Sequence, residues 1–185
     1  MKYKGEQTGT TIGSDVIVRE NVTINRGTSA YGTTKIGNNV LLMAAAHVAH
    51  DCIISDNVIM ANMATLGGHV EIKEYASLGG GVLVHQFCRI GSNVFIGGGF
   101  RVVQDVPPFI LAVGEPLHYG GINSIGLKRR GFTTEALTNI KKAYRKYFRS
   151  DLPRSSALEK MKNEMATSAE IEEIINFIDT SERGI

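Results

Sequence analysis

The chain has 185 residues, of which 43% are hydrophobic and 21% charged, and its formal net charge is +2. This composition is typical of a globular domain and excludes a disordered chain, while 21 glycines against 4 prolines suggest repeated tight turns. No apolar run is long enough to span a membrane, and the first ten residues lack the apolar core of a secretion signal. We therefore expect neither a membrane span nor secretion.

An aliphatic residue recurs at every sixth position over half of the chain. The positions of this series are Ile12, Val18, Ile24, Ala30, Ile36, Leu42, Val48, Ile54, Met60, Leu66, Ile72, Leu78, Val84, Ile90, Ile96 and Val102. A period of six fits neither a helix nor an ordinary strand, and it predicts a parallel β-helix in which three units close a triangular coil of about 18 residues. Residues 1–106 are therefore assigned to a hexapeptide solenoid of about five coils, with the series pointing inward.

The two cysteines test this geometry. Cys52 and Cys88 are 36 residues apart, which places them in one inward column two coils from each other. Because stacked parallel strands lie about 4.8 Å apart, their separation is about 9–10 Å, too far for a disulfide. Both thiols are expected to be buried, reduced and inert.

The C-terminal region has a different pattern. The two prolines at 107–108 lack the N–H groups that a strand ladder needs, so the solenoid ends there. Residues 107–185 are assigned to a linker and a C-terminal helical domain, with helices expected over about 133–149, 153–166 and 168–181. These helices are expected to cover the open end of the solenoid.

Charge is unevenly divided within the helical domain. Residues 128–149 hold eight basic residues against one glutamate, a net +7, whereas residues 150–185 hold four basic and eight acidic residues, a net −4. The basic stretch suggests an acidic partner, although a solvated helix face explains the charge equally well. A nucleic-acid partner is not expected, because no known reader motif is present and the overall charge is low.

Stacking brings most of the histidines together. His50 is 18 residues before Gly68, which is 18 residues before Gln86, so successive coils place His50, His69 and His85 along one flank of the prism within about 10 Å. Such a column suits a general base or a hydrogen-bonding site for a ligand, and a solvated ladder without a role remains the alternative. A zinc site of the kind that β-helical carbonic anhydrases use is not expected, because the HVAH interval is too short.

Glycines mark another face. The triplets at 79–81 and 97–99 are 18 residues apart, so they stack and leave a strip without side chains. The strip is either a groove for an apolar chain, a contact between subunits, or merely a pair of tight corners. Because His50 and Gly98 fall on different faces of one chain, only an oligomer would bring them together.

The segments LLMAAAHVAHDC, LGGHVEI, VLVHQFCRIG, QDVPPF and NSIGLKRRGF resemble those of the UDP-N-acetylglucosamine O-acyltransferases, which begin lipid A synthesis in Gram-negative bacteria. The resemblance covers essentially the whole chain. It implies an all-β, left-handed parallel β-helix with a C-terminal α-helical domain. It also implies a cytoplasmic homotrimer with sites between subunits, which moves an (R)-3-hydroxyacyl group from acyl carrier protein to the sugar 3-hydroxyl. No metal and no cofactor are implied, since the acyl group arrives on the phosphopantetheine of the carrier.

The resemblance also implies a role for each matching residue. His50 matches the general base, Asp51 the carboxylate that orients it, and Gly68 the backbone amide that holds the oxyanion. Gly98 matches the position that measures acyl length. The positions matched to the nucleotide sugar, the donor or the carrier protein are Lys2, His47, His69, His85, Gln86, Asn123, Lys128, Arg129 and Arg130.

Three departures from the family pattern stand out. Family members carry roughly seventy further residues before the position of Lys2, which is about four coils. Asn25 stands where some members have histidine, and Ile125 where some have a glutamate near the ribose. Two alternatives therefore stay open: a shortened, inactive trimer that binds nucleotide sugar or carrier protein as a scaffold, and a different hexapeptide acyltransferase using an amino sugar or acetyl-CoA.

Overall fold

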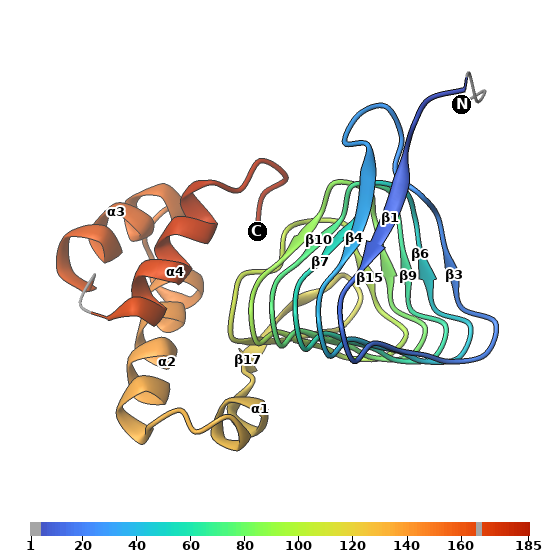
Figure 1. The fold of residues 1–185 in the computed structure, drawn as a ribbon. Helices are drawn as coiled ribbons and strands as arrows, with labels where there is room; N and C mark the ends of the chain where they lie inside the picture. Colours follow the sequence, from blue (N-terminus) through green and yellow to red (C-terminus); the bar gives the residue numbers. More distant parts are fainter. Residues whose placement is uncertain (1–4, 166–167) are drawn as a thin grey trace.

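The computed structural model describes residues 5–165 and 168–185, and it consists of a triangular prism of stacked coils followed by a group of helices (Figure 1). The first sheet contains β1 (Gly9–Ile12), β4 (Thr33–Ile36), β7 (Ile53–Ile54), β10 (Glu71–Ile72) and β13 (Arg89–Ile90). The second contains β2 (Ile17–Val18), β5 (Leu41–Leu42), β8 (Ile59–Met60), β11 (Ser77–Leu78), β14 (Phe95–Ile96), β16 (Ile110–Val113) and β17 (His118–Ile122). The third contains β3 (Thr23–Ile24), β6 (His47–Val48), β9 (Thr65–Leu66), β12 (Leu83–Val84) and β15 (Arg101–Val102).

The core of the prism is the six-residue series. Every position of that series from Ile36 to Val102 is buried, and neighbouring coils pair in parallel with an offset of 18 residues, as Ile36 with Ile54 and Ile54 with Ile72. A fully buried aliphatic side chain stabilises a fold by about 1.5–3 kcal/mol, so this column accounts for the cohesion of the stack. The fold class expected from the repeat is confirmed.

The corners of the prism repeat as regularly as its strands. At nearly every corner the second turn residue has a positive φ, for example 53° at Asn39, 61° at Asp51 and 59° at Asn57. Asparagine, aspartate and glycine tolerate this left-handed conformation best. That preference explains why these residues recur between the strands.

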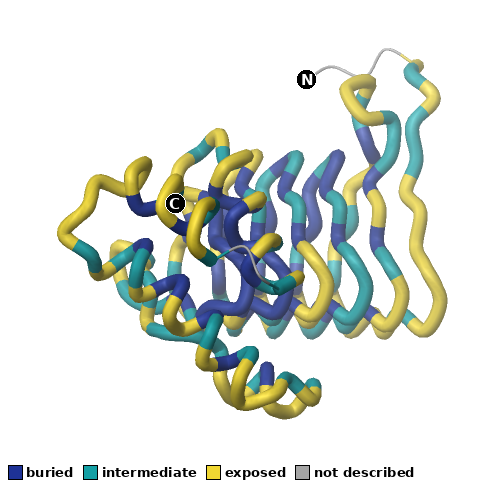
Figure 2. The backbone as a smooth tube through the Cα atoms, turned by 90° about the vertical axis from the view of Figure 1, so that its left-hand side faces the viewer, coloured by how far each residue is buried: buried dark blue, intermediate teal, exposed yellow. Residues whose placement is uncertain are grey.

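The first coil differs from the expectation. β1 pairs with β4 through Ile12 and Ile36, an offset of 24 residues, because residues 27–32 form an extra loop outside the prism (Figure 1). Ala30 is exposed on this loop, so the prediction that it points inward was wrong. Ile12 and Val18 are also exposed, 49% and 48%, because within the described residues their coil has a neighbour on one side only (Figure 2).

A hairpin and a short helix follow the last coil, in the stretch expected to be a linker. β16 adds to β14 in parallel, and β17 pairs with β16 in antiparallel fashion, so the second sheet continues beyond the prism. The helix α1 (Ser124–Arg129) comes directly after this hairpin. The prolines at 107–108 do end the coil pattern, but the strands that follow them were not predicted.

Three longer helices form the rest of the C-terminal part: α2 (Thr134–Arg149), α3 (Arg154–Met165) and α4 (Ala169–Asp179). They lie beside the last coils (Figure 1). The Thr133 hydroxyl caps α2 by accepting from the Ala136 N–H at 3.1 Å, whereas Ser168 precedes α4 without a side-chain cap. The apolar side of α2 is buried, and the Tyr144 hydroxyl donates to the Pro108 carbonyl at 2.5 Å.

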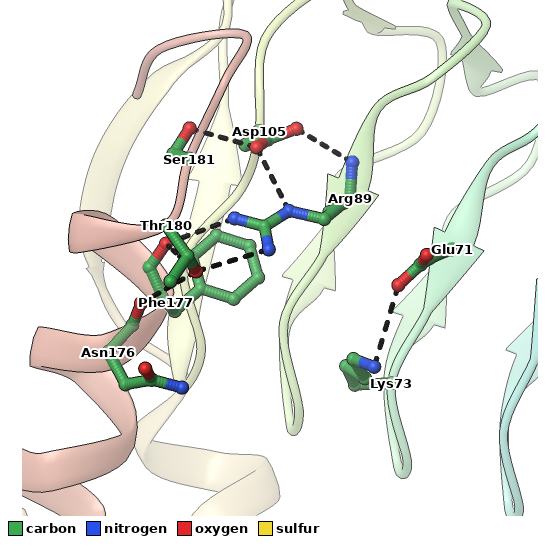
Figure 3. A network of polar contacts seen from close by, with 8 residues as sticks. All are labelled: Glu71, Lys73, Arg89, Asp105, Asn176, Phe177, Thr180 and Ser181. Carbon is green, nitrogen blue, oxygen red and sulfur yellow. Dashed lines mark hydrogen bonds and ion pairs between the residues drawn. The ribbon is translucent and has the colours of Figure 1, made fainter.

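Polar contacts tie α4 to the solenoid (Figure 3). The Asp105 carboxylate accepts from the Arg89 backbone N–H at 2.8 Å, from Arg89 Nε at 3.2 Å and from the Ser181 hydroxyl at 2.8 Å. Arg89 also donates through Nη2 to the Phe177 carbonyl at 3.1 Å. This buried, charge-assisted network fixes the helical part on the final coils.

The cysteines behave as predicted. Cys52 and Cys88 are both buried and free, and burial raises the pKa of each thiol to about 11. Thiols of that pKa are inert at neutral pH. Among residues 5–165 and 168–185, no helix has the length and apolar character that crossing a bilayer requires.

Candidate active site

The predicted site residues fall at the three corners of the prism. We call residues 49–52, 67–70 and 85–88 the histidine corner, between the third and first sheets. Residues 79–82 and 97–100, between the second and third sheets, form the glycine corner. Residues 37–40, 55–58, 73–76 and 91–94, between the first and second sheets, form the arginine corner, which is named for Arg130 packed against it.

The histidine corner has the stacking that the sequence predicts. The His69 N–H donates to the His50 carbonyl at 3.1 Å, and the Phe87 N–H donates to the Gly68 carbonyl at 3.0 Å. Each bond joins one coil to the next. His50, Gly68 and Gln86 therefore occupy equivalent positions on three successive coils.

His50 and Asp51 form a pair at this corner. His50 Nδ1 lies 2.9 Å from Asp51 Oδ2, with the imidazole one-third exposed and the carboxylate fully buried. Because an ionised carboxylate only accepts, Nδ1 carries a proton, and in the neutral imidazole Nε2 therefore keeps its lone pair. His50 thus presents a basic nitrogen to the open side of the corner.

The buried Asp51 carboxylate is held by donors on both oxygens. Thr28 donates through its backbone N–H to Oδ1 at 2.8 Å and through its hydroxyl to Oδ2 at 2.6 Å. Burial by itself raises the pKa of Asp51, but the two Thr28 bonds and the His50 bond outweigh it, so the pKa lies below its usual value. Asp51 is therefore ionised wherever His50 functions as a base.

His69 lies in an aromatic enclosure next to this pair. Its ring stacks on Phe87 with centroids 4.5 Å apart, and it meets the edges of Tyr31 at 4.9 Å and His50 at 5.1 Å. Its Nε2 is 3.8 Å from Asp51 Oδ2, and its buried Nδ1 has no protein partner. Packing fixes the orientation of this imidazole while leaving one nitrogen for a ligand.

The His50 ring lies directly against Gly68, in the space that a side chain there would fill. A β-carbon built at Gly68 would lie 2.6 Å from His50 Cε1 and 2.8 Å from Nε2, which is far inside van der Waals contact. Within the described residues, no acceptor is recorded for the Gly68 backbone N–H. The corner thus combines a lone pair and an unpaired amide donor with no side chain between them.

The remaining predicted residues of this flank are spread around the pair. His47 lies on β6, where its Nδ1 is 2.7 Å from the Thr23 hydroxyl. His85 and Gln86 are exposed, and His85 Nδ1 lies 3.0 Å from the Gln86 carbonyl. Lys2 lies outside the described residues.

Gly98 lies at the glycine corner, away from His50. The two triplets stack as predicted, since the Gly99 N–H donates to the Gly80 carbonyl at 2.8 Å. Gly81 and Gly99 occupy the left-handed position of their turns, with φ values of 68° and 77° that glycine adopts most easily. Gly98 has no such requirement, although a β-carbon there would lie 3.1 Å from the Gly80 oxygen. Its bare backbone is a feature of the surface rather than of the turn.

Asn123 and Arg130 lie at the third corner. The Asn123 side chain caps α1 by accepting from the Gly126 N–H at 3.1 Å and donates to the Asn93 carbonyl at 3.0 Å. Arg130 donates to the Tyr75 carbonyl at 3.0 Å, and burial lowers its pKa. Its Nη1 is buried without a protein partner. The neighbouring Lys128 and Arg129 are exposed.

The predicted residues therefore do not form one site within one chain. The general-base pair, the glycine strip and the Asn123–Arg130 group belong to three different corners. A prism has its corners on different sides, so a ligand that touches all three groups has to touch more than one copy of the chain.

One cluster has the composition of a metal site. The donor atoms of His50, Asp51 and His69 all lie within 4.8 Å of one another. A metal ion there would have to displace hydrogen bonds that already occupy the Asp51 carboxylate, at 2.6 Å from the Thr28 hydroxyl and 2.9 Å from His50 Nδ1. This arrangement suits a hydrogen-bonded pair better than a set of ligands.

Sequence reasoning missed Thr28, Tyr31 and Phe87. Thr28 and Tyr31 lie on the extra loop, which the period of six conceals because the loop has the length of one repeat unit. Phe87 was detectable, since it is 18 residues after His69 and therefore stacks on it. The signal in the sequence is an aromatic residue at a turn position of the repeat. In the structure this residue has a left-handed φ of 64°.

Comparison with known proteins agrees with this geometry. Residues 33–68 match the family described as bacterial transferase hexapeptide (six repeats), and residues 105–185 match that described as UDP-N-acetylglucosamine O-acyltransferase, domain 2. The acyl-[acyl-carrier-protein]–UDP-N-acetylglucosamine O-acyltransferase of Syntrophobacter fumaroxidans is 50% identical over 185 residues, covering 99% of this chain and 72% of that protein. The enzyme of the same description from Thermodesulfovibrio yellowstonii is 50% identical over 186 residues, with 100% and 72% covered.

Solved structures match over the same extent. The UDP-N-acetylglucosamine acyltransferase of Bacteroides fragilis has a TM-score of 0.96 at 50% identity, with 99% of this chain and 72% of that chain covered. The enzyme of Francisella novicida has a TM-score of 0.96 at 40% identity, with 100% and 68% covered.

The solenoid and its corner chemistry define a hexapeptide-repeat transferase. Within that class, the similarity extends over the coils, the hairpin and the helices alike. The chain belongs to the family of acyl-[acyl-carrier-protein]–UDP-N-acetylglucosamine O-acyltransferases.

Proposed function

We propose that this chain transfers an (R)-3-hydroxyacyl group from acyl carrier protein to the 3-hydroxyl of UDP-N-acetylglucosamine, the first step of lipid A biosynthesis. The observation that carries the proposal is the buried Asp51 hydrogen-bonded to His50, whose ring lies directly against Gly68. Family membership supplies the substrates, and this corner supplies the chemistry.

His50 acts as the general base in this proposal. Its Nε2 removes the proton of the sugar hydroxyl as the oxygen attacks the thioester carbonyl. Asp51 stabilises the imidazolium that forms, because its carboxylate is ionised and 2.9 Å from Nδ1. When the tetrahedral intermediate collapses, the carbon–sulfur bond breaks and the thiolate takes the proton back from His50. A thioester is already activated, so the reaction includes no covalent enzyme intermediate, metal or cofactor.

The Gly68 N–H is assigned to the oxyanion. It belongs to the residue stacked on His50 in the next coil, and the hydrogen-bond network of the described residues leaves it unused. A preorganised donor of this kind typically contributes 10²–10³ in rate. A side chain at this position would displace the His50 ring from its place beside this amide.

The proposal includes a homotrimer with the site between subunits. Its main support is the separation of the three groups of site residues onto three corners. A second support is the outward face of the second sheet, where Ile17, Ile59 and Phe95 are exposed at aligned positions on their coils. An apolar column of this kind is typical of a surface that packs against another subunit.

The remaining site residues take the roles that the family resemblance gives them. The exposed Lys128 and Arg129 supply cations for an acidic carrier protein, as the basic stretch suggests. His69, His85, Gln86, Asn123 and Arg130 are assigned to the nucleotide sugar, and His47 to an accessory position. Gly98 is assigned to the end of the acyl groove. The location proposed for this reaction is the cytoplasm.

The proposal is tested by a transfer assay with 3-hydroxyacyl carrier protein and UDP-N-acetylglucosamine. We expect His50→Ala to lower kcat by at least about 100-fold, the usual contribution of a general base. Ser14→Ala, at the arginine corner of the first coil, is the matched control and should retain activity. A wild-type rate in the His50 variant would exclude it as the base.

Mass in solution tests the shared site separately. Sedimentation equilibrium should give about three chains per particle. A single chain at working concentrations would remove the composite site, because His50 and Arg130 would then have no means of meeting one substrate.

A further inference from the structure

We propose that Thr28, on the loop of residues 27–32, is a positioning residue that holds Asp51 so that His50 keeps its Nε2 free to accept a proton. The inference rests on the proposed function, since it assigns Thr28 a part in presenting the base of that reaction. Thr28 does not touch the open side of the corner; it acts through Asp51.

The hydrogen bonds around Asp51 define this role. Its Oδ2 accepts from the Thr28 hydroxyl at 2.6 Å and from His50 Nδ1 at 2.9 Å, while its Oδ1 accepts from the Thr28 backbone N–H at 2.8 Å. The Ala30 N–H donates to the Thr28 hydroxyl oxygen at 3.2 Å, which directs the hydroxyl proton toward Asp51. The carboxylate is thus fixed in the plane that receives Nδ1–H.

Burial makes these donors necessary. The Asp51 side chain is fully buried, so water does not replace a donor that is removed. Its backbone is also constrained, with φ of 61° and its N–H bonded to the Thr34 hydroxyl at 2.8 Å. Only the side-chain torsions are free to respond, and Thr28 restrains both oxygens that those torsions move.

His69 is a second potential hydrogen-bond donor to the Asp51 carboxylate. His69 Nε2 is 3.8 Å from Asp51 Oδ2, beyond hydrogen-bond distance. The Thr28 hydroxyl occupies this same oxygen at 2.6 Å. Without the hydroxyl, a small rotation of Asp51 toward His69 would lengthen the hydrogen bond from His50 Nδ1. The imidazole proton of His50 would then no longer be held on Nδ1.

The loop is built to hold Thr28 in place. The Gly27 N–H donates to the Gly9 carbonyl at 2.9 Å, and the Gly32 N–H donates to the Thr28 carbonyl at 2.7 Å, which closes the loop at both ends. A β-carbon at Gly27 would lie 2.3 Å from the Thr33 nitrogen, so the start of the loop packs directly against the first residue of β4. Tyr31 on the same loop packs against His69. The insertion therefore supplies a lid over the Asp51 side of the pair.

Two substitutions at one position separate positioning from packing. Thr28→Val keeps the shape and the backbone N–H but removes the hydroxyl, and it should lower kcat about 10-fold with KM for UDP-N-acetylglucosamine changed less than about 2-fold. Thr28→Ser restores the hydroxyl and should recover kcat to within about 3-fold of wild type. Thr138→Val is the matched control, because its hydroxyl bonds only the Thr134 carbonyl in α2.

A spectroscopic measurement tests the tautomer directly. Nitrogen-15 NMR of histidine-labelled protein should show His50 as the single Nδ1–H tautomer in the wild type and the Ser variant, and a mixture in Thr28→Val. A wild-type kcat in Thr28→Val, or an equal loss in the Ser variant, would overturn the inference.

The NMR result also separates the two proposals. If the wild-type chain transfers no acyl group, the proposed function fails. An unchanged His50 tautomer in Thr28→Val would then refute the role of Thr28 on its own account, whatever the reaction is.

Discussion

The arginine corner and the histidine corner are made from the same turn, but they use its unpaired amide in different ways. In the first two turns on the arginine side, the first turn residue is capped by a side chain of the next coil: the Asn38 N–H donates to Asp56 Oδ1 at 2.7 Å, and the Ser14 N–H donates to Asn38 Oδ1 at 2.9 Å. At the histidine corner, the Gly68 N–H has no such cap in the described structure.

The aspartate stands one position later in the turn at the histidine corner than at the arginine corner. Asp56 is the first residue of its turn and points to an amide, whereas Asp51 is the second residue of its turn and bonds an imidazole. A shift of one residue thus converts a structural cap into a group that orients a base. The comparison teaches that an uncapped turn amide gains a chemical use where a base stands beside it, as His50 stands beside Gly68.

The largest effect on kcat is expected from a substitution at Gly68, whose backbone N–H has no acceptor in the described structure. Gly68→Ala adds a β-carbon that would lie 2.6–2.8 Å from the His50 ring, so either the ring or the oxyanion loses its place. We expect kcat to fall by about 10²–10³, the range for losing an oxyanion donor. The measurement is single-turnover transfer under saturating donor.

Folding should be affected less than the rate, because Gly68 is not among the residues with positive φ and the β-carbon would contact the His50 side chain rather than backbone. A melting temperature near that of wild type, together with the lost rate, would separate chemistry from stability. Activity within a few-fold of wild type would mean that the intermediate lies elsewhere.

An intermediate effect, on selectivity rather than rate, is expected at the glycine corner. Gly98→Met directs a long side chain outward from a position whose bare surface is not required by its backbone. Within the proposed trimer, that side chain fills the end of the acyl groove, so the preferred donor should become shorter, with at least about a 10-fold change in relative kcat/KM between long and short donors. An unchanged ranking over a series of acyl chain lengths would defeat this assignment of Gly98.

The smallest effect, on stability alone, is expected from a substitution of Asp56, which accepts from the Asn38 N–H at the arginine corner. Hydrogen bonds from the Asn38 backbone N–H and side chain keep the pKa of Asp56 below its usual value. Its ionised form therefore stabilises the fold above about pH 4, and this contribution disappears as the pH falls through the lowered folded pKa. Asp56→Ala should lower the melting temperature slightly at pH 7, with activity unchanged and the gap closing under strongly acidic conditions.

Asp56→Asn is the matched variant for that prediction. It keeps the oxygen that accepts from Asn38 but has no charge to titrate, so its stability relative to wild type should vary less with pH than that of the alanine variant. A gap for Asp56→Ala that is the same at pH 3 and pH 7 would show that the cap does not depend on ionisation.

The sequence predicts the interior of the solenoid well because one physical rule governs it. Each coil repeats its neighbour, so the buried series from Ile36 onward and the stack of His50 beneath Gly68 both follow from counting. The same rule conceals the extra loop, since an insertion as long as one unit leaves the register of six intact. An uninterrupted register of six places Thr28 within a coil, whereas in the structure it bonds Asp51 from the extra loop.

Features beyond the repeat depend on packing that no local pattern records. The hairpin of β16 and β17 pairs with β14 outside the hexapeptide register. Arg130 reaches Tyr75 across 55 residues of sequence, so its place at the third corner is a property of the folded chain. The roles of these residues came from family resemblance, and the structure supplies the reason why one chain does not unite them.

The left-handed corners have a consequence for how this protein tolerates heat. Side chains other than glycine, asparagine and aspartate occupy that conformation at a cost of about 1–2 kcal/mol each, and here they include Ala45, His69 and Phe87. At the exposed Ala45 the cost serves no visible contact, so glycine or asparagine there would make the protein more resistant to melting. At His69 and Phe87 the same cost aligns two stacked rings beside the base. Substitutions meant to raise the melting temperature should therefore be made at corners such as that of Ala45, while His69 and Phe87 are kept.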